Sequence, residues 1–330
     1  MFRKTPGLHP DMVMTAFEVG ESEKVFDLLL VDEAHRLNQR ANESSGVQNR
    51  KFREITETLF GSDDTSKTQL DWIKARSRHQ IVLVDAAQSV RPADVPSELL
   101  EELVGSARAG GRLYPLMSQM RVAAGDDYVG YVRRMLGGGH TSAFVLGEAV
   151  HPQDFEGYDF RMFDSVAAMQ AAVRARDVEV GLSRLLAGHA WEWKSRGDRA
   201  AFDIEIDGVQ LRWNSTQTDW IASPGSLEEV GSIHTVQGYD LNYAGVIIGR
   251  DLRYDPVAGQ LFVDRGSYFD TKGKENNRQL GVVYSDEDLL RFVRNVYAVL
   301  LTRGIRGTYV FVQDEGLGEY LGRFIPRFGF

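Results

Sequence analysis

Asp27-Leu-Leu-Leu-Val-Asp-Glu-Ala-His-Arg-Leu37 is the stretch that decides the fold of this chain. Its four consecutive apolar residues, 28–31, are too few for a helix core and predict a fully buried strand of a parallel sheet. The strand delivers Asp32 and Glu33 to its carboxyl end, where open α/β sheets bind their ligands. In a nucleotide hydrolase the first carboxylate would hold Mg2+ and the second would polarise the attacking water. The alternative is an acidic surface turn that caps the following helix, and the motif favours the hydrolase.

The composition indicates a globular protein of ordinary make-up. The chain has 330 residues, enough for two domains, with 43% apolar and 26% charged residues. It has no cysteine, which excludes disulfides, thiolate catalysis and cysteine-ligated metal centres. No apolar run is long enough to span a membrane and no signal-like core follows the first residues, so we expect a cytoplasmic protein without a membrane partner. The net charge of −9 means that any contact with nucleic acid must use a local basic patch.

The first half of the chain is notable for a motif that it lacks. No G-x-x-x-x-G-K-[ST] loop, the usual cradle for nucleotide phosphates, occurs in the sequence. Residues 61–68 contain a lysine followed by a threonine, but they lack the second glycine and carry two acidic residues, so we interpret them as a solvated loop. Upstream of the acidic pair, residues 13–19 predict one strand.

Two further strands are predicted in the first half, each followed by a polar residue. The strand that begins at residue 79 leads into Gln88, which could reach a γ-phosphate; a loop glutamine that faces solvent is an equally good interpretation. A short strand at 113–117 precedes Arg121, which could neutralise a transferring phosphoryl group. The other interpretation pairs Arg121 with Asp126 or Asp127.

The second half contains a β-rich stretch with four of the five tryptophans, at positions 191, 193, 213 and 220. Tryptophans beside basic residues could stack the bases of a single strand, but filling a core is the more common role and is favoured here. A glycine-broken segment, 231–240, then precedes a buried strand at 244–249. Its polar side chains could bind a phosphate backbone and sense nucleotide, or could only satisfy local backbone groups. No neighbouring ligands support a metal at His234.

The last segment predicts a helix from 286 to about 301, followed by Arg303 and a strand at 308–312. Arg303 would meet a nucleotide from a second domain if two sheets face each other. Its alternative role is a cation at the C-terminal end of the helix, where the helix dipole favours positive charge.

Five of these segments, taken in order, resemble the motifs of superfamily 1 DNA/RNA helicases. The similarity is greatest to the Schlafen group 3-like DNA/RNA helicase domain family. DLLLVDEAHRL looks like motif II (Walker B), IVLVDAAQSVRP like motif III, SQMR like motif IV, SIHTVQGYD like motif V and VLLTRGIRGTYVFV like motif VI. The final motif differs from the Q-x-x-G-R-x-x-R pattern of superfamily 2.

This resemblance implies an α/β fold of two RecA-like parallel-sheet domains of the P-loop NTPase type, with ATP and Mg2+ as cofactors and DNA or RNA, as a single strand, as partner. Residues 1–111 would form an incomplete first domain, and residues 112–330 a second domain with a β-rich, tryptophan-containing insert. The implied roles are Mg2+ binding by Asp32, water activation by Glu33, γ-phosphate sensing by Gln88, arginine fingers at Arg121 and Arg303, nucleotide contacts at Gln237 and Gly238, and nucleic-acid contacts at Ser232, His234 and Thr235.

The departure from the family pattern is the absent Walker A segment. Its lysine and amide groups normally stabilise the β- and γ-phosphates, so we expect this polypeptide alone to hydrolyse ATP very poorly. We also expect an exposed strand edge in the first domain, which a partner or a missing N-terminal segment would complete. Two functions follow from the sequence: a fragment of an ATP-dependent helicase or translocase, or an ATPase-inactive module that binds nucleic acid or regulates on a helicase scaffold.

Overall fold

The computed structural model describes residues 7–42, 45–85, 88–116, 122–137, 152–216, 219–236 and 238–329, and within them it omits the side chains of residues 126 and 127. The chain divides into two compact units. Unit 1 comprises Met1–Tyr114 and Lys272–Tyr284, and unit 2 comprises Pro115–Thr271 and Ser285–Phe330. The chain therefore passes between the units three times.

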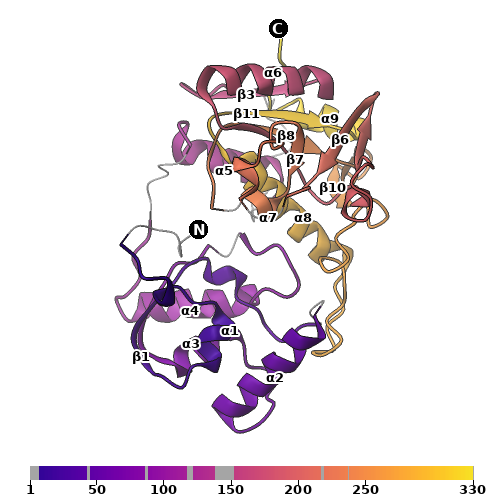
Figure 1. Cartoon of the computed structure of the whole chain (residues 1–330). Helices are drawn as coiled ribbons and strands as arrows, with labels where there is room; N and C mark the ends of the chain where they lie inside the picture. Colours follow the sequence, from indigo (N-terminus) through magenta and orange to yellow (C-terminus); the bar gives the residue numbers. More distant parts are fainter. Residues whose placement is uncertain are drawn as a thin grey trace. The chain divides into compact units, whose positions relative to one another are not determined.

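Unit 1 is built on two parallel strands and helices (Figure 1). Strand β1 pairs with β2 in a register that sets Val31 opposite Val82. Val31, Val19 of α1 and Ile73 of α3 are buried in one small core. The elements are α1 (Ala16–Glu21), β1 (Phe26–Val31), α2 (Gly46–Phe60), α3 (Gln69–Ala75), β2 (Ser77–Val82) and α4 (Ser97–Ala109), with 3-10 turns at Pro10–Met12 and Ala34–Arg36.

Helix α1 lies where the sequence predicted a strand at 13–19, so that prediction was wrong. Thr15 accepts a hydrogen bond from the Glu18 N–H, and the Glu18 carboxylate accepts one from the Thr15 N–H. This capping box satisfies two backbone donors at once and starts a helix in a segment with apolar residues of high strand propensity. Local capping chemistry here outweighs the apolar pattern.

Strand β1 is confirmed, but its predicted complete burial is wrong. Leu28 and Leu30 are 55% and 66% exposed, whereas Val31 is buried. On β2, Ile81 lies opposite Leu30 in the register and is also exposed. One face of this two-stranded sheet therefore packs on the core of unit 1, while the other presents aliphatic side chains to solvent.

The predicted strand at 113–117 is not found in its described part, residues 113–116. Helix α4 ends in a tight turn in which the Arg112 N–H donates to the carbonyl of Ala107 and Gly111 adopts a positive φ. Tyr114 and Leu116 then project into solvent. Backbone without a neighbouring strand to pair with does not form a ladder.

Residues 272–284 return from unit 2 to unit 1 and are fixed there by side-chain hydrogen bonds to backbone. The Asn277 amide donates to the carbonyl of Arg40 at 2.7 Å, and the Lys272 ammonium donates to that of Asn42 at 2.8 Å. The Tyr284 hydroxyl donates to the carbonyl of Pro92. The segment is thus attached beside the loops that follow β1 and β2.

Unit 2 contains a seven-stranded sheet in the order β3-β11-β8-β4-β7-β6-β5, parallel except for the β5–β6 hairpin. Helices α6 and α8 cover opposite faces of the sheet (Figure 1). Gly245 of β8 has no side chain, and α6 fills that space with Met169 and Val173. The bounds are α5 (Gly125–Met135), β3 (Asp159–Phe163), α6 (Val166–Val180), β4 (Ser183–Ala187), β5 (Ile204–Ile206), β6 (Val209–Trp213), β7 (Glu229–Gly231), α7 (Ile233–Val236), β8 (Leu241–Ile248), β9 (Leu252–Asp255), β10 (Gln260–Val263), α8 (Asp286–Leu301), β11 (Gly304–Val312) and α9 (Glu315–Leu321), with 3-10 turns at Lys194–Arg196 and Trp220–Ala222.

The tryptophan-rich stretch forms one end of this same sheet. Trp213 and Trp220 are buried, and Trp191 and Trp193 pack against the core that contains Trp213. These positions match the favoured interpretation, in which the tryptophans fill a core.

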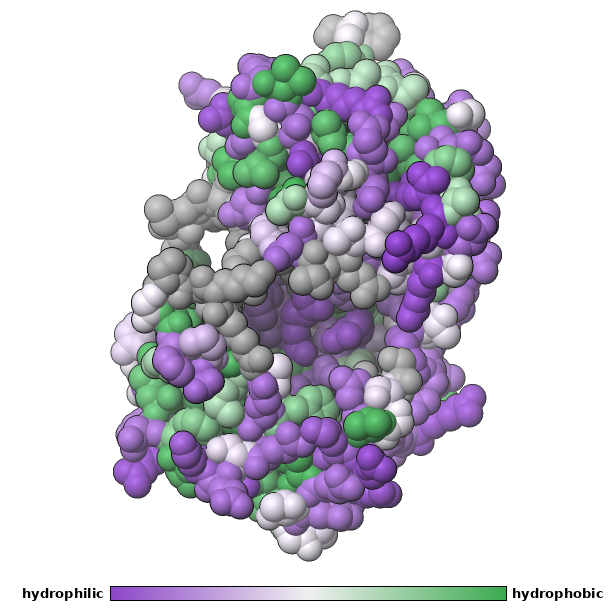
Figure 2. All heavy atoms as spheres, in the orientation of Figure 1, coloured by the Kyte–Doolittle hydropathy of each residue, from purple (hydrophilic) through white to green (hydrophobic). Residues whose placement is uncertain are grey.

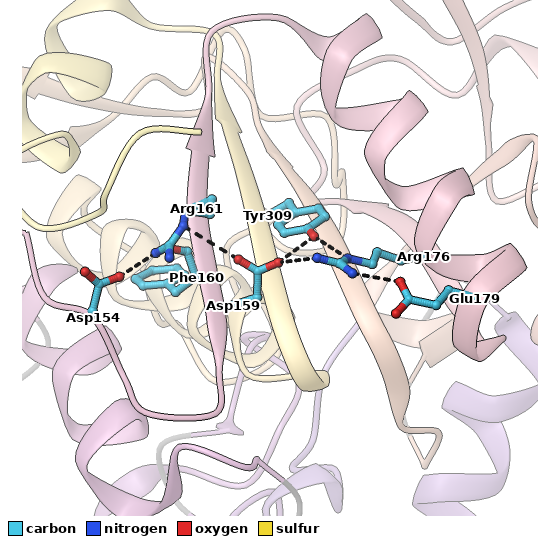
Figure 3. Close-up of polar contacts among 7 residues, drawn as sticks. All are labelled: Asp154, Asp159, Phe160, Arg161, Arg176, Glu179 and Tyr309. Atoms are coloured by element: carbon cyan, nitrogen blue, oxygen red, sulfur yellow. Dashed lines mark hydrogen bonds and ion pairs between the residues drawn. The ribbon is translucent and has the colours of Figure 1, made fainter. Parts of the chain in front are cut away.

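A polar network attaches α6 to the sheet (Figure 3). The Arg176 guanidinium donates to the Tyr309 hydroxyl at 2.9 Å and to Asp159 at 3.1 Å, and Tyr309 donates to the same carboxylate at 2.7 Å. Arg176 also pairs with Glu179, while Arg161 extends the network from Asp159 to a further carboxylate, Asp154. Each charged or hydroxyl side chain drawn in Figure 3 is paired within unit 2, so the network has a structural role.

The surface drawn in Figure 2 is largely hydrophilic, and its apolar residues form separate patches. Within the part of the chain that the structure describes, no helix is both long enough and apolar enough to cross a membrane.

Candidate functional site

The acidic pair lies directly after β1, as the sequence predicted. Asp32 and Glu33 are both exposed, and the Glu33 N–H donates to a carboxylate oxygen of Asp32 at 3.0 Å. Glu33 has φ 51° and ψ 43°, in the left-handed region that non-glycine residues rarely adopt. Such a conformation costs about 1–3 kcal/mol and is common at functional sites. The backbone therefore turns away from the direction of β1 at Glu33.

Backbone hydrogen bonds hold the ends of β1 and β2 together beyond the strands themselves. The Leu83 N–H donates to the carbonyl of Val31 at 2.8 Å, and the Ala34 N–H donates to that of Leu83 at 2.9 Å. Gln88 follows β2 and donates from its side chain to the Asp85 carboxylate at 3.0 Å. Glu33 and Gln88 are thus on loops that leave adjacent strand ends.

His35 links those two loops. Its ring is 2% exposed, and its Nδ1 accepts the backbone N–H of Asp85 at 3.3 Å. Its Nε2 lies 3.1 Å from Oε2 of Glu33, within hydrogen-bonding distance but outside the angular range of a hydrogen bond. A chain of polar contacts therefore runs from Glu33 through His35 and Asp85 to Gln88.

Two arginines, Arg36 and Arg91, supply positive charge near these polar contacts. Burial lowers the pKa of Arg36, and the neighbouring charge of Arg91 lowers it further, while Asp94 and Glu33 oppose the shift. Arg91 donates to Asp94 through both its Nε and its Nη2 atoms. The carboxylate of Asp94 also accepts the backbone N–H groups of Val90 and Arg91, so the loop after β2 is held in a defined shape.

The predicted residues of segment 231–240 lie around α7 in unit 2. Ser232 and Thr235 are buried and bond to each other, with the Ser232 N–H donating to the Thr235 hydroxyl at 2.8 Å. The Thr235 hydroxyl donates to the carbonyl of Ser232. His234 is exposed, and its ring lies 5.7 Å from that of His189, the second residue after β4. Of these three side chains, only His234 faces solvent.

Gly238 precedes β8, and Arg303 precedes β11, the strand that pairs with β8 in unit 2. Gly238 is exposed with φ 81°, and three residues later the Leu241 N–H donates to the carbonyl of Arg303 at 3.1 Å. The Arg303 side chain is buried, at 4% exposure, just before β11. The structure thus brings motifs V and VI together through the backbone.

Arg121 and Gln237 lie outside the described residues, so their predicted roles stay predictions. Asp32, Glu33 and Gln88 belong to unit 1, and Ser232, His234, Thr235, Gly238 and Arg303 to unit 2. Among the described side chains no cluster of three or more His, Asp or Glu could hold a metal ion.

Sequence reasoning did not single out His35, Asp85 or Arg36 as site residues. His35 and Arg36 stand within the quoted acidic motif, and Asp85 stands three residues before Gln88. Their position within or close to the predicted motifs was the signal that the sequence offered for a role in the site. Their contacts, however, depend on the pairing of β1 with β2.

Unit 2 is a mostly parallel α/β unit, and unit 1 carries an acidic pair at the carboxyl end of a parallel strand, where open α/β sheets bind their ligands. The chain belongs to the Schlafen group 3 DNA/RNA helicase domain family, whose model matches residues 8–314, and it is therefore a helicase-like protein. It is also 32% identical over 221 residues to the uncharacterized protein YPL245W of Saccharomyces cerevisiae. That similarity covers 64% of this chain and 48% of the yeast protein, so the chain spans about half the length of the curated relative that it matches.

Proposed function

We propose that this chain is the part of an ATP-dependent DNA or RNA helicase or translocase that carries motifs II to VI. Each compact unit would then be one RecA-like domain. The observation that carries the proposal is the placement of Asp32 and Glu33 at the carboxyl end of β1, connected by polar contacts to Gln88 in the loop that follows β2. Nucleotide hydrolases require these groups on adjacent loops, because catalysis of phosphoryl transfer is mainly positioning and electrostatics.

Asp32 is the residue that would hold Mg2+. This ion is usually bound by one or two carboxylates together with substrate phosphates and water, so the lack of a three-residue cluster in the described chain is compatible with it. The ion would neutralise charge on the β- and γ-phosphates. Glu33 would orient water, Gln88 would contact the γ-phosphate, and Arg303 and Arg121 would stabilise charge on the transferring group.

Nucleic acid would bind unit 2 through the region of α7. His234 is exposed there, whereas Ser232 and Thr235 shape the turn that presents it. Because the net charge is −9, we expect weak binding that uses a local basic patch and that weakens as the salt concentration rises. Gln237 and Gly238 would connect this turn to the nucleotide.

The test is ATP turnover by the chain with Mg2+, measured with and without single-stranded DNA or RNA. We expect slow turnover that one of these strands stimulates, and a loss of at least tenfold in Glu33→Gln. Glu101→Gln removes the same charge from the exposed face of α4 and should leave turnover unchanged. Turnover that survives Glu33→Gln would contradict the assigned role of Glu33.

The second candidate function is an ATPase-inactive module that binds nucleic acid or regulates on the same scaffold. The strained Glu33 turn and the buried Arg303 are compatible with it, because neither geometry by itself requires turnover. Binding of a labelled single strand at low salt, without any nucleotide turnover, would favour this module. Absence of binding to DNA and RNA at low salt would reject both functions.

A further inference from the structure

The His35 ring is held from one side by the backbone of the other strand's loop. The Asp85 N–H can only donate a hydrogen bond, so the Nδ1 atom that accepts it carries no proton. In a neutral imidazole the single proton is then on Nε2. The fold thereby selects one tautomer, in which Nε2–H faces the Glu33 carboxylate 3.1 Å away.

The Nε2 atom is buried, and no described residue forms a hydrogen bond with it in this structure. A buried donor without a partner is costly, because it loses its hydrogen bonds to water and gains none in the protein. Glu33 Oε2 is already within reach, and the Glu33 side chain is about half exposed. Catalytic hydrogen bonds are often misaligned before substrate binds and become aligned in the complex.

We propose that His35 is the positioning residue for Glu33. Its Nε2–H orients the Glu33 carboxylate, and its Nδ1 fixes that orientation to the backbone of Asp85. Since the Asp85 carboxylate accepts the side-chain amide of Gln88, the ring also couples the position of Glu33 to the loop that carries Gln88. The proposal rests on the proposed function of Glu33 as the residue that orients water.

Two substitutions of His35 test the roles of the two ring nitrogens separately. In His35→Asn the side-chain oxygen can replace Nδ1 and accept the Asp85 N–H, but no donor reaches Glu33. In His35→Gln the amide group reaches the position of Nε2 and can donate to Glu33, but the acceptor for Asp85 is lost. The pair therefore distinguishes positioning of Glu33 from support of the backbone.

We expect His35→Asn to lower kcat at least tenfold with the KM for ATP within twofold of the parent value. His35→Gln should recover most of kcat, even though it is the less stable of the two variants. A purely structural role predicts the opposite order, with activity following thermal stability. Parent-like kcat in His35→Asn, or equal loss in both variants, would overturn the proposal.

A measurement on the parent chain tests the contact without turnover. Long-range 1H–15N NMR spectra of the imidazole should show the Nε2–H tautomer of His35. The Nε2 signal should shift in Glu33→Gln and stay unchanged in Glu101→Gln. An Nδ1–H tautomer, or an Nε2 signal that does not respond to Glu33→Gln, would reject the proposal. If these spectra agree but the parent chain shows no turnover, the proposed function fails and the contact between His35 and Glu33 stands.

Discussion

The Tyr297 hydroxyl donates to a carboxylate oxygen of Asp251 at 2.6 Å, and both side chains are buried inside unit 2. The same hydroxyl accepts the backbone N–H of Gly249 at 3.1 Å, so it joins α8 to the end of β8. Burial raises the pKa of Asp251 to about 7, against the smaller opposing effect of the Tyr297 hydrogen bond. This carboxyl group titrates near neutral pH in the folded protein.

The raised pKa predicts a pH dependence of stability. In the unfolded chain an aspartate titrates near pH 3.9, so between about pH 4 and 7 the folded state holds one more proton. The contribution of this group to the free energy of unfolding is therefore greatest below about pH 4 and falls as the pH rises to 7, by up to about 1.4 kcal/mol per pH unit. Asp251→Asn should reduce this slope in urea titrations, while Asp207→Asn, an exposed control, should not. An unchanged slope in Asp251→Asn would contradict the assignment.

The network around Arg176 predicts the effect of removing one hydroxyl. Tyr309→Phe deletes the hydroxyl that accepts a hydrogen bond from Arg176 and donates one to Asp159. The partly buried side chains of Arg176 and Asp159 then both lose this partner. We expect a loss of about 1–3 kcal/mol in the free energy of unfolding of unit 2, measured by urea denaturation. Tyr239→Phe removes an exposed hydroxyl bonded to Asp219 and should cost less than half as much. Equal effects would show that burial of the network does not matter.

Two glycine substitutions should act in opposite directions. A Cβ at Gly249 would lie 2.2 Å from the Cβ of Ala190 and 2.8 Å from the ring of Trp191. Gly249→Ala should therefore destabilise unit 2 by about 1–3 kcal/mol through overpacking. Gly105 lies within α4 with open space around it, so Gly105→Ala should stabilise unit 1 by about 0.5–1 kcal/mol. Thermal unfolding followed by circular dichroism measures both, and a stable Gly249→Ala would require rearrangement of the loop after β4.

The nucleic-acid contact proposed for His234 predicts the effect of removing its side chain. His234→Ala should weaken binding of a single-stranded oligonucleotide at low salt at least threefold, because its side chain is exposed on α7. His79→Ala removes an exposed histidine of β2 in unit 1 and serves as the control. Fluorescence anisotropy at two salt concentrations gives the measurement. Equal affinities for His234→Ala and the parent chain would remove His234 from the interface.

Elements with strong local signals were predictable. Helix α8 begins at Asp286, as predicted, because Ser285 and Asp288 form a capping box and its apolar residues follow the helical period. Strand β11, Gly304–Val312, contains the strand predicted at 308–312 and ends at the predicted residue. By contrast, the exposure of Leu28 and Leu30 could not be read from their sequence, because burial of a strand face depends on which elements cover it.

The sequence by itself determined the acidic pair and its place after a strand, because four aliphatic residues followed by Asp32 and Glu33 form one local pattern. Tertiary structure decided what surrounds that pair. Asp85 is fifty residues from His35 along the chain, and only the parallel pairing of β1 with β2 brings its N–H to the imidazole. Every residue except proline has a backbone N–H, so the sequence does not show which N–H donates to His35. The tautomer of His35 and its approach to Glu33 therefore follow from the fold alone.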